Sequence, residues 1–142
     1  MLYKDFIKVA SVTPVLKVGN PIFNVKEMLQ QLKDIKSSIT VFPELSVTAY
    51  TCNDLFLHSD LINQTEEAIA YFLNHNTYEG IVVIGAPFTI NDVQYNTAFV
   101  IQGQKILGIV PKFYLPNTSE FYEKRWFQSG FEITTDVTRV DY

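Results

Sequence analysis

The sequence is poor in the residues that build disulfides and metal sites. Cys52 is its single cysteine, and His58 and His75 are its only histidines. One thiol cannot form an internal disulfide, and without a Cys/His cluster there is no zinc motif. The N-terminus lacks the charged start, apolar stretch and small-residue cleavage site of a secretion signal. We therefore expect a cytoplasmic protein without a metal site.

Long apolar runs, excess positive charge and glycine-rich loops are absent too. No run approaches the ~18 apolar residues of a membrane span. The net charge is −4, and Lys124-Arg125 is the only adjacent basic pair, so neither nucleic acid nor an anionic membrane is expected as a partner. The six glycines are isolated, which argues against a phosphate-binding loop.

Apolar and aromatic residues, by contrast, are plentiful. They include 11 phenylalanines and 8 tyrosines, and 47% of the chain is hydrophobic, enough for one domain with a sizeable core. Residues 6–12 predict a first strand. Asn20 as cap and Pro21 at the first helical position predict a helix that ends near residues 37–38. Strand 39–42 follows at once, and this strand–helix–strand order indicates a βαβ unit.

The middle of the chain predicts a second helix followed by an antiparallel meander. The expected segments are a loop at 45–59, a helix at 61–74, and strands at 80–87, 95–101 and 105–110. Asn91-Asp92 and Gln102-Gly103-Gln104 predict the turns between these strands. The pattern therefore predicts an α/β (α+β) fold with a mixed sheet, and residues 132–142 again have strand-like density.

Two charged residues stand directly after strands that end in proline. Pro43 ends strand pairing because it has no N–H, and Glu44 follows it; Lys112 follows Pro111 in the same way. If the two lie together, the carboxylate suits a general base and the ammonium suits an oxyanion. The alternative is that they form a structural ion pair. The chemistry also needs a nucleophile, and Cys52 is more simply explained as a packing residue.

The surroundings of these two residues carry a family resemblance. The sequence resembles the nitrilase/carbon–nitrogen hydrolase superfamily, and most closely the N-terminal glutaminase domain of bacterial glutamine-dependent NAD(+) synthetases. The similarity extends from Phe6 to about Gly130. The residues that carry it are Val41-Phe42-Pro43-Glu44-Leu45-Ser46 with Tyr50 to Phe56, and Pro111-Lys112 through Leu115-Pro116 to Glu120-Phe121 and Arg125-Trp126-Phe127.

The resemblance implies a role for each of five residues. Glu44 would be the general base, Lys112 would hold the oxyanion, and Glu120 would position the lysine and the substrate. Tyr50 and Phe121 would line a glutamine pocket. Glutamine would be hydrolysed through a thioester, and the ammonia would pass to a synthetase domain that amidates nicotinic acid adenine dinucleotide. That domain would use ATP and magnesium, whereas the glutaminase domain needs no cofactor.

The resemblance also implies a fold and a place in a longer enzyme. The fold would be part of an αββα four-layer sandwich, with residues 1–142 as an N-terminal portion of the glutaminase domain. The family's nucleophilic cysteine lies well beyond the lysine, so we expect this chain to be inactive alone. Uncovered apolar sheet surface would favour a homo-oligomer. Ala49 and Thr118 stand where these proteins usually have glycine and tyrosine.

Three other interpretations of the sequence stay open. One is a stand-alone superfamily amidase acting on another amide. A second is a non-catalytic module that binds glutamine without turnover. A third is a purely structural domain, which leaves the paired Glu44 and Lys112 unexplained.

Overall fold

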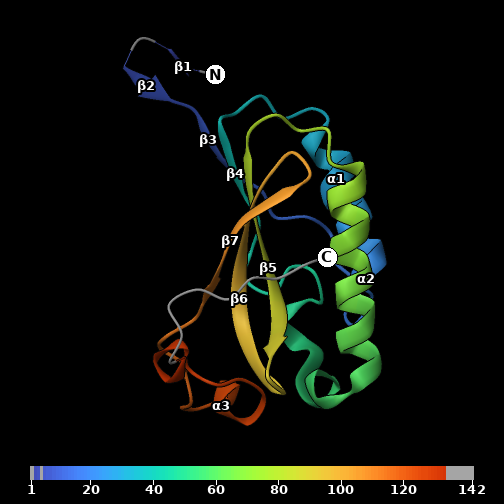
Figure 1. Ribbon diagram of the computed structural model, residues 1–142, viewed down its shortest axis with the longest axis vertical. Coiled ribbons are helices and arrows are strands. Elements are labelled where there is room, and N and C mark those ends of the chain that lie inside the picture. The colour runs from blue at the N-terminus through green and yellow to red at the C-terminus, as the bar shows by residue number, and fades with distance from the viewer. Residues whose placement is uncertain (1, 4, 134–142) are drawn as a thin grey trace.

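The computed structural model describes residues 2–3 and 5–133, and its elements are labelled in Figure 1. The predicted strand-like segment 132–142 lies outside the described residues from position 134 onward. In chain order the elements are β1 (Leu2–Tyr3), β2 (Phe6–Ile7), β3 (Val9–Ser11), α1 (Pro21–Leu32), β4 (Ile39–Val41), η1 (Tyr50–Leu57), α2 (Ser59–His75), β5 (Ile81–Ile90), β6 (Val93–Gln102), β7 (Lys105–Pro111), α3 (Glu123–Trp126) and η2 (Gly130–Glu132).

The main sheet has five strands in the order β3-β4-β5-β6-β7. β3, β4 and β5 are parallel, and β6 and β7 continue the sheet in antiparallel pairing. The expected mixed sheet is thus confirmed. The turn between β5 and β6 is at Asn91 and Asp92, whose φ angles of 49° and 63° suit the tight hairpin turn that the sequence predicted.

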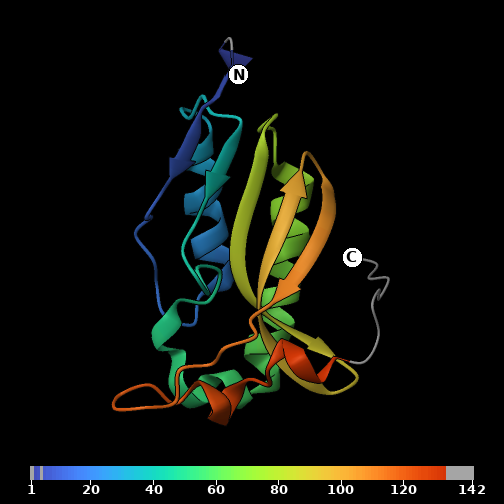
Figure 2. The same ribbon diagram turned by 90° about the vertical axis from the view of Figure 1, so that its left-hand side faces the viewer.

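Both long helices pack on one face of this sheet, as Figures 1 and 2 show from two sides. α1 starts as predicted: the Asn20 side chain accepts a hydrogen bond from the Phe23 N–H at 3.2 Å, and Pro21 is the first helical residue. The largest fully buried side chains between helices and sheet are Phe72, Phe99, Met28, Ile69, Ile84 and Ile101. Each contributes about 1.5–3 kcal/mol by leaving water, so this layer fixes the sheet on which the site is built.

The opposite face of the sheet looks toward the viewer in Figure 2 and carries no helix of the described residues. Valines lie on it, and their exposed fractions are 41% at Val41 and 52% at Val110. The described residues therefore form one helical layer and one sheet of the four layers that the resemblance implies. α3 and its flanking loops lie beyond one end of the strands (Figure 2).

Three predicted elements differ from those observed. The loop expected at 45–59 contains the 3₁₀ helix η1. The first strand, expected at 6–12, is divided: β2 pairs with β1 in a two-stranded ribbon, and only β3 joins the main sheet. α1 ends at Leu32, before the predicted 37–38, and the chain turns through bonds such as Ile35 N–H to the Leu32 carbonyl. Within the described residues, no helix has the length and apolar character that crossing a bilayer requires.

Candidate active site

Glu44 lies in a loop that interrupts the pairing of two parallel strands. The Phe42 N–H bonds to the Val83 carbonyl and the Val47 N–H to the Gly85 carbonyl, both at 2.9 Å, so residues 43–46 leave the sheet and return to it. The backbone at Leu45 has φ of 51°, a left-handed conformation that is rare outside glycine. Such strain persists where the surroundings enforce it, and it is frequent at functional sites.

Lys112 directly follows β7, where the strand pairing with β6 continues by one residue. Its N–H donates to the Asn96 carbonyl at 2.8 Å, and its own carbonyl accepts from the Gly130 N–H at 2.9 Å. The backbone of Lys112 is therefore held on both sides. Its side chain reaches the Glu44 loop on the open face, where both residues line a shallow cavity of about 340 Å³.

The Lys112 ammonium lies between two carboxylates. Its Nζ is 2.7 Å from Glu44 Oε1 and 3.1 Å from Glu123 Oε1. Burial lowers the pKa of Lys112, but the hydrogen bonds and charges of the two glutamates outweigh it and hold this pKa above its ordinary value. The lysine therefore remains a fixed positive charge at neutral pH, the state that stabilising an oxyanion requires.

Glu123 rather than Glu120 makes the contact expected of the second glutamate. The Glu123 side chain is 1% exposed, whereas Glu120 lies exposed on the preceding loop. Within the described residues, Glu120 makes no ion pair with Lys112.

Tyr50 joins the charged cluster, and Phe121 does not. The Tyr50 hydroxyl donates to Glu123 Oε1 at 2.9 Å. Burial, followed by the bond to Glu123 and its negative charge, raises the pKa of Tyr50 far above its ordinary value. Phe121 is 39% exposed, so it does not belong to the core. The structure thus brings Glu44, Lys112 and Tyr50 together and leaves Glu120 and Phe121 outside the hydrogen-bonded cluster.

Sequence reasoning also missed Asn96. This residue lies on β6, is 3% exposed, and its Nδ2 donates to Glu44 Oε1 at 2.5 Å. Asparagine is depleted in strands, so an asparagine at a strand position was a usable signal for a polar partner. The sequence did not indicate that this partner is Glu44, which lies 52 positions away.

An ion pair fixes the short helix that carries Glu123. Asp54 of η1 accepts from Arg125 at 2.7 and 2.9 Å and from the Trp126 indole at 2.9 Å. These donors hold the pKa of Asp54 well below its ordinary value. The fork-shaped geometry ties η1 to α3 in one orientation, so Tyr50 and Glu123, which begin these two elements, face each other.

Cys52 is placed as a packing residue. It is 3% exposed, lies in a cluster with Leu45, Phe56 and Phe127, and its Sγ donates to the Thr48 carbonyl at 3.1 Å. Burial raises the pKa of the Cys52 thiol, although two hydrogen bonds oppose this effect. A buried thiol with a raised pKa is a poor nucleophile, in agreement with the structural role expected of it.

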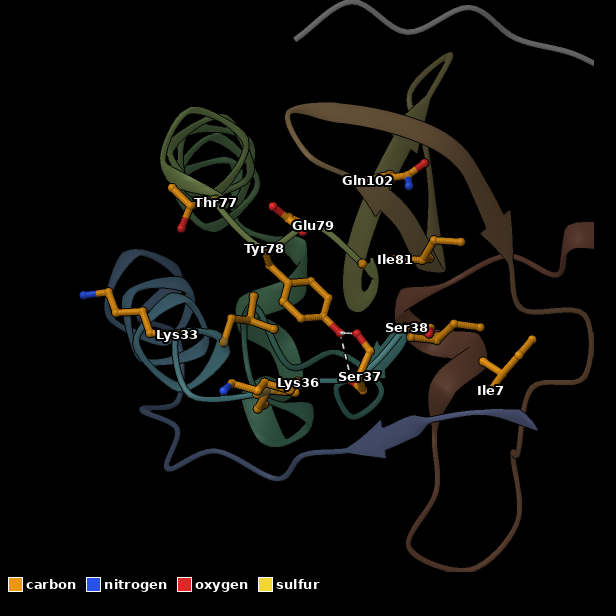
Figure 3. A pocket seen from close by; sticks show the side chains of 14 residues that line it. Ile7, Lys33, Lys36, Ser37, Ser38, Thr77, Tyr78, Glu79, Ile81 and Gln102 are labelled. Carbon is orange, nitrogen blue, oxygen red and sulfur yellow. Dashed lines mark hydrogen bonds between the residues drawn. The ribbon is translucent and has the colours of Figure 1, made fainter. Parts of the chain in front are cut away.

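A larger cavity lies far from this cluster. It measures about 850 Å³ and lies at the other end of the strands, where Tyr78, Ser37 and Lys36 line it (Figure 3). The Tyr78 hydroxyl is within 3.0 Å of both the Ser37 and Thr40 hydroxyls, so these buried groups satisfy one another. No group of three or more His, Cys, Asp and Glu suited to a metal ion occurs in the described part of the chain.

This fold, with a lysine between two glutamates at the end of its strands, is that of a carbon–nitrogen hydrolase. The chain matches the carbon–nitrogen hydrolase family over residues 21–141 and belongs to that family. Within the family it is similar to glutamine-dependent NAD(+) synthetases. It is 35% identical over 129 residues to the synthetase of Mycobacterium tuberculosis, an alignment that covers 88% of this chain and 19% of the relative.

Solved structures give the same result. A glutamine-dependent NAD(+) synthetase from Cytophaga hutchinsonii superposes with a TM-score of 0.80 at 27% identity, covering 87% of this chain and 22% of that one. An amidase from Nesterenkonia sp. superposes with a TM-score of 0.73 at 15% identity, covering 87% and 48%, and shows the shared fold. The chain thus spans about a fifth of the length of the synthetases it resembles. The family resemblance inferred from the sequence is confirmed.

Proposed function

We propose that this chain is the N-terminal portion of the glutaminase domain of a glutamine-dependent NAD(+) synthetase. The observation that carries the proposal is the position of the Lys112 ammonium, 2.7 Å from Glu44 and 3.1 Å from Glu123. A base and a fixed cation beside one cavity suit attack on an amide carbon. The likeness to the synthetases over 88% of the chain supports glutamine as the amide.

In the proposed reaction, Glu44 removes the proton from a cysteine thiol that is supplied outside these 142 residues. The thiolate attacks the side-chain amide carbon of glutamine, and Lys112 stabilises the oxyanion that forms. Collapse of this tetrahedral intermediate breaks the carbon–nitrogen bond, and the amide nitrogen leaves as ammonia with the proton that Glu44 returns. Water then hydrolyses the thioester to glutamate. Glu123 holds Lys112 in place, and Tyr50 and Phe121 contact the substrate.

The ammonia would be consumed by a synthetase domain of the same enzyme, which binds ATP and magnesium and amidates nicotinic acid adenine dinucleotide to NAD. The residues described here include no group assigned to that nucleotide. Their part ends with the release of ammonia. Because Cys52 is buried and its thiol is engaged, this chain alone is expected to hydrolyse no glutamine.

The test is glutamine hydrolysis by the natural polypeptide that contains this chain, measured as ammonia released. Replacing Glu44 by Gln should lower kcat by roughly 10²- to 10⁴-fold, the usual contribution of a general base. Steady, Glu44-dependent ammonia release by the 142-residue chain alone would contradict the expected inactivity. Turnover of other amides but not of glutamine would instead identify an amidase of another specificity.

A matched pair of variants tests the assignment of the second glutamate. Glu123→Gln weakens the hold on Lys112 and should lower kcat by at least tenfold. Glu120→Gln, three residues earlier on the exposed loop, should leave kcat within about twofold of the parent, as surface substitutions usually do. The reverse result would return the role to Glu120.

A further inference from the structure

Asn96 contacts both Glu44, the proposed base, and Lys112, the residue proposed to stabilise the oxyanion. Its side-chain Nδ2 donates to Glu44 Oε1 at 2.5 Å, and its main-chain carbonyl accepts from the Lys112 N–H at 2.8 Å. The residue is 3% exposed and lies inside β6, so the sheet fixes its position. Glu44, in contrast, has a 43% exposed side chain on a loop. The rigid partner in this contact is therefore the asparagine.

The contact distinguishes the two oxygens of the Glu44 carboxylate. Oε1 accepts both the Asn96 amide at 2.5 Å and the Lys112 ammonium at 2.7 Å. Oε2 accepts no hydrogen bond from any residue that the structure describes. A carboxylate that acts as a base needs one unoccupied oxygen directed at the proton it takes. The two donors on Oε1 leave Oε2 in that state beside the cavity.

We infer that Asn96 is a positioning residue that holds Glu44 for proton transfer, an inference that rests on the proposed glutaminase function. Lys112 alone cannot keep this role through the reaction, because its ammonium is also needed at the oxyanion. The Asn96 amide stays on Oε1 when Lys112 turns toward the substrate. A neutral amide also suits the position because it donates a hydrogen bond without taking up the proton that Glu44 must receive.

The inference predicts how kcat and KM divide in Asn96→Ala. A hydrogen bond to a charged group is worth enough to change a rate by roughly 10- to 100-fold. In the natural polypeptide that contains this chain, Asn96→Ala should lower kcat for glutamine hydrolysis by that factor and change KM by less than about threefold. In a Glu44→Gln background the same substitution should lower kcat no further, because Asn96 acts through Glu44.

Asn76→Ala is the matched control. Asn76 is also almost buried, at 4% exposed, and its Nδ2 donates one hydrogen bond, to the Gly103 carbonyl at 2.7 Å, at the far end of the sheet. The Asn76→Ala substitution removes a comparable buried amide and should leave kcat unchanged. Equal kcat values for Asn96→Ala and Asn76→Ala would overturn the inference, as would a full additional loss in the Glu44→Gln background.

A second measurement does not depend on turnover or on the folding of the alanine variant. In the NMR spectrum of the chain, Glu44→Gln should shift the side-chain amide proton of Asn96 upfield and leave that of Asn76 in place. An unmoved Asn96 signal overturns the inference. A parent polypeptide that releases no ammonia from glutamine refutes the proposed function instead, and the amide signal then decides alone whether Asn96 holds Glu44.

Discussion

Gly85 offers the sharpest test of how the Glu44 loop is built. A Cβ atom added at Gly85 would lie 2.3 Å from Leu45 N, 2.7 Å from Pro43 O and 2.9 Å from the Glu44 carbonyl carbon. All three are main-chain atoms, so no side chain can rotate away. Restoring the ordinary contact distance of 3.4 Å to the Leu45 nitrogen requires a shift of about 1 Å. Gly85→Ala must therefore displace the loop that carries the proposed base.

The expected loss of stability follows from opposing contributions. Overpacking costs about 1–3 kcal/mol. A displaced loop also weakens the bonds from the Val47 N–H to the Gly85 carbonyl and from the Gly85 N–H to the Ser46 hydroxyl, at about 1 kcal/mol each. Replacing glycine lowers the entropy of the unfolded chain and returns about 0.4–1 kcal/mol. We expect the free energy of unfolding to fall by about 2–4.5 kcal/mol.

Urea unfolding followed by circular dichroism measures this change, with Gly108→Ala as control. Gly108 lies in β7 opposite Val100, and a Cβ added there meets nothing within 4 Å. That variant should keep or slightly raise the unfolding free energy. In the natural polypeptide, Gly85→Ala should also reduce kcat by roughly 100-fold at a temperature where it stays folded, since 1 Å of misplacement costs about that much. Equal stability of the two alanine variants would refute the close approach of the loop to Gly85.

Four further predictions concern single residues and the open sheet face. Ala49 has φ of 70° and ψ of 151°, a backbone conformation suited to glycine. Ala49→Gly should therefore raise the free energy of unfolding by about 1 kcal/mol, because the strain it relieves exceeds the loss of one buried methyl group. A loss of stability would contradict this expectation. The Cys52 thiol should react slowly with an aromatic disulfide reagent in the native chain and rapidly in urea, whereas fast native reaction would contradict its burial. Because burial and Glu123 raise the pKa of Tyr50, its phenol should stay protonated above pH ~10 while unfolded tyrosine ionises, so stability should decline as pH rises beyond that value. The ionisation of Tyr50 can be followed by the tyrosinate absorbance that is lost in Tyr50→Phe. In Glu123→Gln this ionisation should occur at a lower pH than in the parent, and an unchanged titration would argue against the contact between Tyr50 and Glu123. The apolar open face should cause self-association that Val110→Lys reduces, and a strictly monomeric sedimentation profile at high concentration would refute this.

The sequence predicted those elements whose signals are local. The cap at Asn20 with Pro21 marked the start of α1, and the left-handed preference of Asn91 and Asp92 marked the hairpin turn. At Ala49 the structure instead explains an expectation drawn from the sequence. Its positive φ gives a physical reason for the glycine expected at that position. Signals of this kind depend on a few neighbouring residues, so no knowledge of tertiary contacts was needed.

The choice between Glu120 and Glu123 needed tertiary information. Both precede the same aromatic run, and either could reach a lysine on an extended loop. What decides between them is the orientation of α3, which Asp54 fixes from 71 positions away through Arg125. The role of Asn96 was hidden for the same reason, because its partner Glu44 lies on a different strand connection. Contacts at such separations leave no periodic pattern in the sequence.

Glu44 and Lys112 both follow the ends of strands, but this shared position is not what brings their side chains together. The two residues follow strands β4 and β7, which β5 and β6 separate in the sheet, so a common edge alone would leave them three strands apart. Residues 43–46 close this distance by passing over β5 at Gly85, where the missing side chain lets the main chain approach. Asn96 on β6 then receives Glu44, and Lys112 comes from the far side. The glycine is thus as necessary to the geometry of the site as the charged residues themselves.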